Sequence, residues 1–191
     1  MSKFGVVMVA HVGCGTWTRG LLDILDRSAK AQEDWTKCIV DRCNSVPKAR
    51  FCTTEKQRWE GLPLSALFDA TYDPESVGDK EILLLSMCCG RRSSTNSLSK
   101  YLMVASGRAS VYIQGTRATK ILQPGIMLLA LGIICVHEAG GKRDDWEGID
   151  IDFGADQTER RVLYPSGGFM VTNGNIHGEL LEMLASTSAI A

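Results

Sequence analysis

The stretch that most constrains the fold of this chain is an apolar run from Gly125 to Val136, followed by His-Glu-Ala-Gly-Gly at 137–141. The run holds twelve residues, whereas a helix that crosses a bilayer needs about 20. Paired glycines are typical of a helix end, because glycine adopts the left-handed backbone conformation without strain. The pattern therefore predicts a buried core helix over residues 126–139 and not a membrane anchor.

The rest of the chain alternates between apolar stretches and amphipathic ones. Residues 4-FGVVMVAHVG-13 predict a strand buried on both faces. Residues 97–106 have helical spacing and should end at Gly107. Further strands are predicted over 35–41, 49–53, 81–87, 110–114, 149–153, 161–163 and 169–172. Helices are predicted over 55–68 and 176–184. Residues 19–34 are expected to form a helix or an irregular excursion of the chain. This alternation after residue 80 favours α/β layering.

Length, net charge and cysteine count argue against several classes of function. A chain of 191 residues suits one domain, or one domain plus part of another. A net charge of −1 gives no general attraction to nucleic acid or to an anionic membrane. Seven cysteines are present, without zinc spacing and without a secretory signal at the start. These features favour reduced thiols, and cytoplasm is the default expectation for location.

Two residues at the predicted helix start could bind an anion. Ser97 and Lys100 are three residues apart, so both could reach a phosphate beside the free backbone N–H groups of the helix. The alternative is a capping serine and a surface lysine. The preceding loop, residues 91–96, resembles an anion-binding or phosphorylation segment, although a solvated loop is the simpler interpretation.

Carboxylates near the carboxyl end of the chain offer a second set of candidates. Asp144 and Asp145 follow the glycine pair and could bind a metal, although turn chemistry is the simpler interpretation. Asp150 and Asp152 fall on one face of a predicted strand and could share a cation, or they are solvated. The three histidines, His11, His137 and His177, show no metal-binding spacing.

Several motifs together resemble one family. His-Glu-Ala-Gly-Gly at 137–141, followed by Asp145, Gly148 and 151-IDF-153, resembles the carboxy-terminal signature of the inositol monophosphatase superfamily. The stretches 9-VAHVGCGTWT-18, 97-SLSKYLMVASGRASVYI-113 and 166-SGGFMVTNGNIHGELLEML-184 resemble 3′(2′),5′-bisphosphate nucleotidases, most closely the plant HAL2-like phosphatases of 3′-phosphoadenosine 5′-phosphate. The resemblance extends over nearly all of residues 4–184 and is weak over 19–34 and 55–80.

This resemblance implies Mg²⁺ ions, held by several carboxylates, that activate water against a phosphate ester. The family takes these ligands from a Glu-Glu pair, an Asp-Pro-Ile-Asp-Gly-Thr segment and a Trp-Asp-His-Ala segment, and none of these occurs here. Counted back from Glu138, the last segment falls on residues 127–130, where the metal-binding aspartate is Leu128. The chain is therefore expected to begin after the amino-terminal motifs and to hold neither metal ligands nor catalytic residues.

The resemblance also implies an architecture, a partially complete layered αβαβα sandwich of the inositol monophosphatase type. Residues 1–191 are expected to form one truncated domain, in which 4–53 are a remnant of the first antiparallel sheet and 80–191 form the carboxy-terminal α/β subdomain. The core is expected to include Leu62, Leu84, Leu102, Val111, Ile134 and Val171.

The expected function is that of a bisphosphate nucleotidase that is inactive alone. The alternative is a catalytically dead relative that binds a nucleotide or a protein partner. Ser97 and Lys100 match family residues that contact the nucleotide phosphate, so an adenosine bisphosphate is the expected ligand. Pairing with a full-length relative is a further expectation, and neither nucleic acid nor a membrane is expected as a partner. Family members also occur in plastids or mitochondria.

Overall fold

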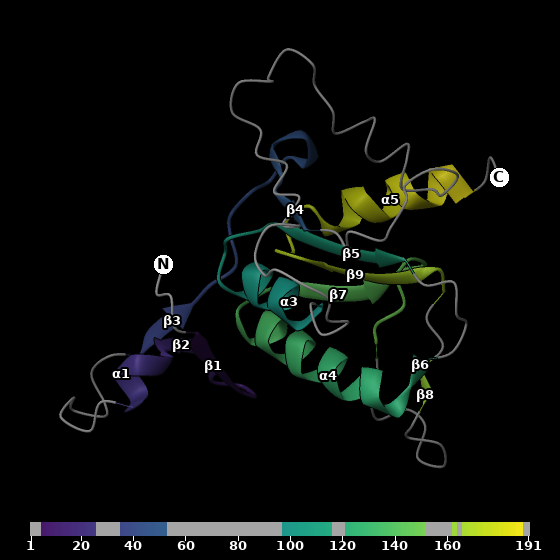
Figure 1. Ribbon diagram of the computed structural model, residues 1–191. Coiled ribbons are helices and arrows are strands. Elements are labelled where there is room, and N and C mark those ends of the chain that lie inside the picture. Colours follow the sequence, from purple (N-terminus) through teal and green to yellow (C-terminus); the bar gives the residue numbers. More distant parts are fainter. Residues whose placement is uncertain are drawn as a thin grey trace.

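A computed structural model describes residues 5–25, 35–52, 97–115, 121–151, 162–163 and 166–188. The first part is a three-stranded antiparallel sheet of β1 (Val6–His11), β2 (Gly15–Gly20) and β3 (Thr36–Cys38), with the short helix α1 (Leu21–Leu25) after β2 (Figure 1). β1 and β2 form a hairpin in which Val6 pairs with Gly20 and His11 with Gly15.

A four-stranded sheet forms the centre of the rest of the chain. Its order is β4 (Phe51–Cys52), β5 (Val111–Gly115), β9 (Gly168–Thr172) and β7 (Lys142–Asp145). β4 runs parallel to β5, while β5 and β7 are antiparallel to β9. All five residues of β9 are buried, as expected for a central strand with both faces covered. A two-stranded ribbon joins β6 (Ile121–Leu122) to β8 (Val162–Leu163).

Helices cover both faces of this sheet. α3 (Ser97–Ala105) and α4 (Gln123–Glu138) lie on one face and α5 (His177–Ser188) on the other (Figure 1). Alternate residues of the strands follow this layering: Tyr112 packs with the α3 and α4 cluster, and Val111 packs with the α5 cluster. A 3-10 turn, η1 (Val46–Lys48), places Val46 in the α5 cluster.

Two glycines fix the position of α4. A Cβ at Gly132 would lie 2.5 Å from ring atoms of Tyr101, so a glycine is required where α3 and α4 come this close. At the end of α4, Gly140 has a φ of 93° and the N–H of Gly141 donates to the carbonyl of Val136 at 2.9 Å. This is the hydrogen-bonding pattern of a glycine-terminated helix, and it confirms the helix end predicted from the Gly-Gly pair.

The prediction for the first strand was wrong on one point. β1 exists, but it is not buried on both faces, since Val9 is 45% exposed on the face opposite Met8 and Ala10. Val6, at the start of the strand, is 57% exposed as well. Only the face that carries Met8 and Ala10 packs against the α3 and α4 cluster. Alternation of side chains across a strand explains the difference, because a single layer covers one face only.

Other boundaries also differ from the predictions. Asp144 and Asp145, for which turn chemistry was expected, are the last two residues of strand β7, because β9 offers residues 142–145 an edge to pair with. Residues 149–151 of the predicted strand 149–153 form only an isolated bridge from Asp150 to Asp144. Residues 19–25 divide between the end of β2 and α1. β4 pairs with β5 in the second sheet, although its residues were expected in the first.

The predicted core is correct in part. Val111 and Val171 are fully buried, whereas Leu102 and Ile134 are only partly buried, and the neighbouring Ile133 takes the central position on α4. A helix presents one stripe to the core, so a one-residue shift moves a side chain away from it. The predictions for Leu62 and Leu84, and for elements 55–68 and 81–87, lie outside the described residues.

The five described cysteines should differ sharply in reactivity. Burial raises the pKa of Cys38 and Cys135, and it raises the pKa of Cys52 to about 11, whereas Cys14 is exposed. Because the thiolate is the reactive form, we expect iodoacetamide at pH 8 to label Cys14 roughly 100-fold faster than Cys52. Peptide mass spectrometry checks this, and equal labelling of the two thiols in folded protein would contradict it.

Candidate functional site

The start of α3 carries both sequence-predicted binding residues. Ser97 is the first residue of this helix, and Lys100 follows one turn later. Lys100 is only 6% exposed, and its Nζ lies 5.8 Å from the centroid of the Tyr112 ring, a cation–π arrangement. Burial raises the pKa of Tyr112, so its hydroxyl stays protonated and donates to Oε1 of Gln114 at 2.7 Å. The surface-lysine interpretation is therefore wrong, while phosphate binding by Ser97 and Lys100 stays a prediction.

The family resemblance predicts a metal-binding aspartate in the amino-terminal half of α4. The positions concerned, Met127, Leu128, Leu129 and Ala130, lie within the helix, and its first turn contains no acidic residue. Leu129 is buried. The carboxylate of this helix is Glu138, at the opposite end, where its Oε2 accepts the backbone N–H of Gly15 at 3.1 Å. Thioether and alkyl side chains offer Mg²⁺ no oxygen ligand, so this part of the site does not fit the metal that the family implies.

The carboxylates after α4 have structural partners. Asp145 accepts the backbone N–H groups of Glu147 and Ile149 through Oδ1, at 3.0 and 2.9 Å, and that of Ser166 through Oδ2 at 3.0 Å. This favours the turn interpretation of Asp145 over the metal interpretation. Asp150 pairs with Nε of Arg143 at 3.2 Å on the surface. Asp152 lies outside the described residues. Among the residues that are described, no three His, Cys, Asp or Glu side chains are grouped as a metal site would require.

His177 joins β9, β7 and α5. Its Nδ1 lies 2.9 Å from the hydroxyl oxygen of Thr172, and its Nε2 lies 2.7 Å from Oδ2 of Asp144. The carboxylate of Asp144 can only accept, so Nε2–H of His177 donates to it. In the neutral ring Nδ1 then accepts the Thr172 hydroxyl, whose oxygen also accepts the N–H of Gly174. Thr172 is fully buried, so this chain of hydrogen bonds holds the start of α5 and does not expose a nucleophile.

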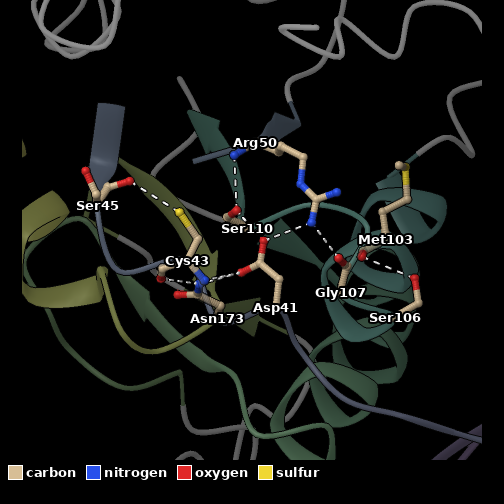
Figure 2. Close-up of polar contacts among 9 residues, drawn as sticks. All are labelled: Asp41, Cys43, Ser45, Arg50, Met103, Ser106, Gly107, Ser110 and Asn173. Carbon is tan, nitrogen blue, oxygen red and sulfur yellow. Dashed lines mark hydrogen bonds and ion pairs between the residues drawn. The ribbon is translucent and has the colours of Figure 1, made fainter. Parts of the chain in front are cut away.

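Asp41 is the centre of a polar cluster that joins three distant segments (Figure 2). Its Oδ2 accepts the Ser110 hydroxyl at 2.5 Å and Nη2 of Arg50 at 3.2 Å. Its Oδ1 accepts Nδ2 of Asn173 at 2.5 Å and the backbone N–H of Cys43 at 3.3 Å. These partners place the segment before β4, the start of β5 and the end of β9 in one fixed arrangement.

The charge of Asp41 is stabilised by these contacts. Burial by itself would raise its pKa, but hydrogen bonds from Ser110, Asn173, Arg50 and the backbone of Cys43 outweigh burial and lower the pKa. Arg50 also donates to the carbonyl of Gly107 at 2.7 Å, so it connects Asp41 to the turn after α3. The cluster therefore helps to hold the helix that carries Ser97 and Lys100.

Sequence reasoning did not find this cluster. Asp41 ends a predicted strand, and Asn173 belongs to an Asn-Gly pair that reads as a turn. Asp41 lies 69 residues from Ser110 and 132 residues from Asn173 in the chain. No local signal in the sequence predicts such contacts. The partnership of His177 with Asp144 was missed for the same reason.

Comparison with known proteins shows what the chain is similar to. A protein of Arabidopsis thaliana that carries the provisional name 3′(2′),5′-bisphosphate nucleotidase, mitochondrial, is 50% identical over 184 residues, which are 96% of this chain and 44% of the relative. A Thermotoga maritima inositol monophosphatase superposes with a TM-score of 0.52 and 16% identity, over 92% of this chain and 53% of its own. The chain is therefore similar in sequence to a protein named as a bisphosphate nucleotidase and shares the fold of inositol monophosphatases. The predicted resemblance is thus confirmed.

Further structures support the same fold. A Pyrococcus horikoshii protein with similarities to inositol-1 monophosphatase superposes with a TM-score of 0.51 and 13% identity, over 93% of this chain and 50% of its own. No protein-family model matches the sequence. The chain spans about half the length of these solved structures and less than half of the Arabidopsis protein. The predicted fold, part of an inositol monophosphatase-type sandwich, is confirmed.

None of the helices in the described ranges is both long enough and apolar enough to cross a bilayer. The name of the Arabidopsis relative places that protein in mitochondria.

Proposed function

We propose that the chain is one half of a bisphosphate nucleotidase-type phosphatase domain, whose complete form hydrolyses 3′-phosphoadenosine 5′-phosphate to AMP and phosphate. The similarity of 50% over 184 residues to a protein of that name supports the substrate class. We further propose that the isolated chain does not turn over its substrate. This second proposal is carried by Leu128, which stands in α4 where the family motif has a metal-binding aspartate.

The chemical argument concerns charge. Phosphate ester hydrolysis by this family uses Mg²⁺ to lower the pKa of a water and to neutralise developing negative charge, which together supply most of the rate. The described residues do not offer the carboxylates that such ions need. They do provide α3 with Ser97 and Lys100, and the Asp41 cluster that holds this helix against the sheet.

Phosphate release tests the proposal directly. We expect the purified chain to release no phosphate above the blank from 3′-phosphoadenosine 5′-phosphate with Mg²⁺, under conditions in which an active family phosphatase does. Calorimetry on the same samples reports binding independently of turnover. Release that exceeds the blank and disappears in Lys100→Ala would show that the chain is a phosphatase by itself, and the second proposal would be abandoned.

A second candidate function is nucleotide binding without turnover. It is favoured by Lys100, whose positive charge is held in a fixed position beside Tyr112 rather than in solvent. In that case calorimetry should detect saturable binding that Lys100→Met weakens at least about tenfold, the effect of losing one charged contact. Lys142→Met removes an exposed lysine from β7 and serves as the matched control.

A further inference from the structure

A cavity of about 570 Å³ lies on the α5 side of the four-stranded sheet. Its described walls are the turn after β7, the residues that lead into β9, and α5. They include Trp146, Glu147, Ser166, Gly167, Leu181 and Glu182. Trp146 and Leu181 pack against the α5 cluster, whereas Tyr112, beside Lys100, packs with the α3 and α4 cluster. The cavity is therefore across the sheet from the residues predicted to bind phosphate.

One buried carboxylate, that of Asp145, holds two walls of this cavity together. Its Oδ1 accepts the N–H of Glu147 and its Oδ2 accepts the N–H of Ser166, both at 3.0 Å. The N–H of Trp146 also donates to the carbonyl of Ser166 at 3.2 Å. The turn after β7 and the approach to β9 are thus fixed against each other. The cavity is largely preformed, as sites for small molecules usually are.

The aromatic side chain of this cavity, Trp146, is held by packing. Gly167 has a φ of 73° and lies directly against the ring, since a Cβ there would be 2.6 Å from Cε3 of Trp146. The turn itself rests on α5, because a Cβ at Gly148 would lie 3.2 Å from Cδ1 of Leu181. The indole Nε1 has no hydrogen-bond partner among the described residues. Trp146 therefore contributes an apolar ring in a fixed position, and indole is the best aromatic partner for a cation.

The charges at this cavity are negative. Glu147 and Glu182 are exposed side chains of its lining, and the described lining contains no Lys, Arg or His. Two carboxylates repel a phosphate ester, so the cavity does not suit a bisphosphate substrate. They attract a cation, which gains both an ion pair and a contact with the indole ring. The volume is within the range of small-molecule sites, about 300–1,000 Å³.

We propose that this cavity binds a small organic cation with a flat apolar body, of the amidinium or guanidinium class. The flat body lies against Trp146 and Leu181, and the charged end faces Glu147 and Glu182. Guanidinium and amidinium groups suit such a site because they are planar and donate two parallel N–H groups to one carboxylate. The proposal is independent of the proposed function, because the residues predicted to bind phosphate lie on the other face of the sheet.

Calorimetry with three probes of similar shape tests the charge requirement. Benzamidine is a cation at neutral pH, benzamide is neutral and benzoate is an anion. We expect benzamidine to bind saturably and at least about tenfold more tightly than benzamide, and benzoate not to bind. The indole N–H resonance of Trp146, assigned by its loss in Trp146→Phe, should shift when benzamidine is added. That shift locates the binding at this cavity.

Two variants and one matched control test the carboxylates. Glu147→Gln and Glu182→Gln should each weaken benzamidine binding about three- to fivefold, as expected for an exposed ion pair, and the double variant about tenfold or more. Glu179→Gln removes an exposed glutamate from the first turn of α5, outside the lining, and should change the affinity less than about twofold. Each variant should melt as the unaltered chain does, since all three side chains are exposed.

Several results would overturn the proposal. Equal affinities for benzamidine and benzamide would show that charge does not matter, and binding that survives the double variant would exclude the two carboxylates. An equal loss in Glu179→Gln would indicate a general effect of net charge. A shift of other indole resonances without that of Trp146 would place the cation elsewhere. Absence of binding by any probe at its solubility limit would show that the cavity takes no ligand of this class.

Discussion

Leu128→Asp should restore turnover once the missing part of the domain is present. In a fusion of this chain to the unmatched segment of the Arabidopsis relative, we expect the unaltered chain to be inactive and the variant to gain at least about 100-fold in phosphate release from 3′-phosphoadenosine 5′-phosphate. The reason is electrostatic: a metal ligand that fixes and activates Mg²⁺ contributes several kcal/mol to the transition state, and about 1.4 kcal/mol is tenfold in rate. Calorimetric titration of the fusion with Mg²⁺ measures its affinity for the metal independently of activity.

Two control variants distinguish ligation from a general effect of charge. Leu128→Asn has nearly the same shape as the aspartate but no charge, and it should recover little activity. Leu131→Asp adds a carboxylate to the same helix at a side chain that is 55% exposed, and it should change neither activity nor Mg²⁺ affinity. The role assigned to Leu128 would be refuted if Leu128→Asp and Leu131→Asp gained phosphate release equally. It would also be refuted if neither variant gained activity although both melted normally.

Asp41→Ala should destabilise the isolated chain by about 3 kcal/mol at pH 7. The substitution removes a charged acceptor from Ser110, Asn173 and Arg50, and hydrogen bonds to charged groups contribute about 1.5–3 kcal/mol each. The loss is smaller than the sum because Asn173 still donates to the carbonyl of Cys43, and Arg50 to that of Gly107. Urea denaturation measures the change.

The effect should depend on pH in a known direction. The pKa of Asp41 is lowered in the folded chain, so its charged form stabilises the fold above the unfolded pKa, and this contribution is lost as pH falls through the folded pKa. We therefore expect the difference between the unaltered chain and Asp41→Ala to be constant from pH 5 to 7 and to shrink below about pH 4. Asp150→Ala, which removes an exposed partner of Arg143, should cost less than about 1 kcal/mol. Similar losses in the two variants would mean that Asp41 stabilises no more than a surface ion pair.

The family resemblance and the type of each major described element could be predicted from the sequence because the signals are local. The apolar run and the Gly-Gly pair predicted α4 and its end within a few residues, and the spacing of Tyr101 and its neighbours predicted α3. The substitution at Leu128 was visible for the same reason, since it depends only on counting along one helix. Helical periodicity and glycine stops act over a few residues, and a single sequence contains them in full.

Contacts between segments that are distant in the sequence were decided only by the tertiary structure. Residues 142–145 became a strand because β9 lay beside them, and Lys100 proved buried because β5 brings Tyr112 to α3. Asp41 acquired its partners from 69 and 132 residues away. The exposure of Val9 on β1 is a further example. The apolar sequence of this strand indicates that both of its faces could be buried, but only the arrangement of the layers shows that one face is. Burial and long-range hydrogen bonding depend on which segments the fold brings together, and that information is not local to any motif.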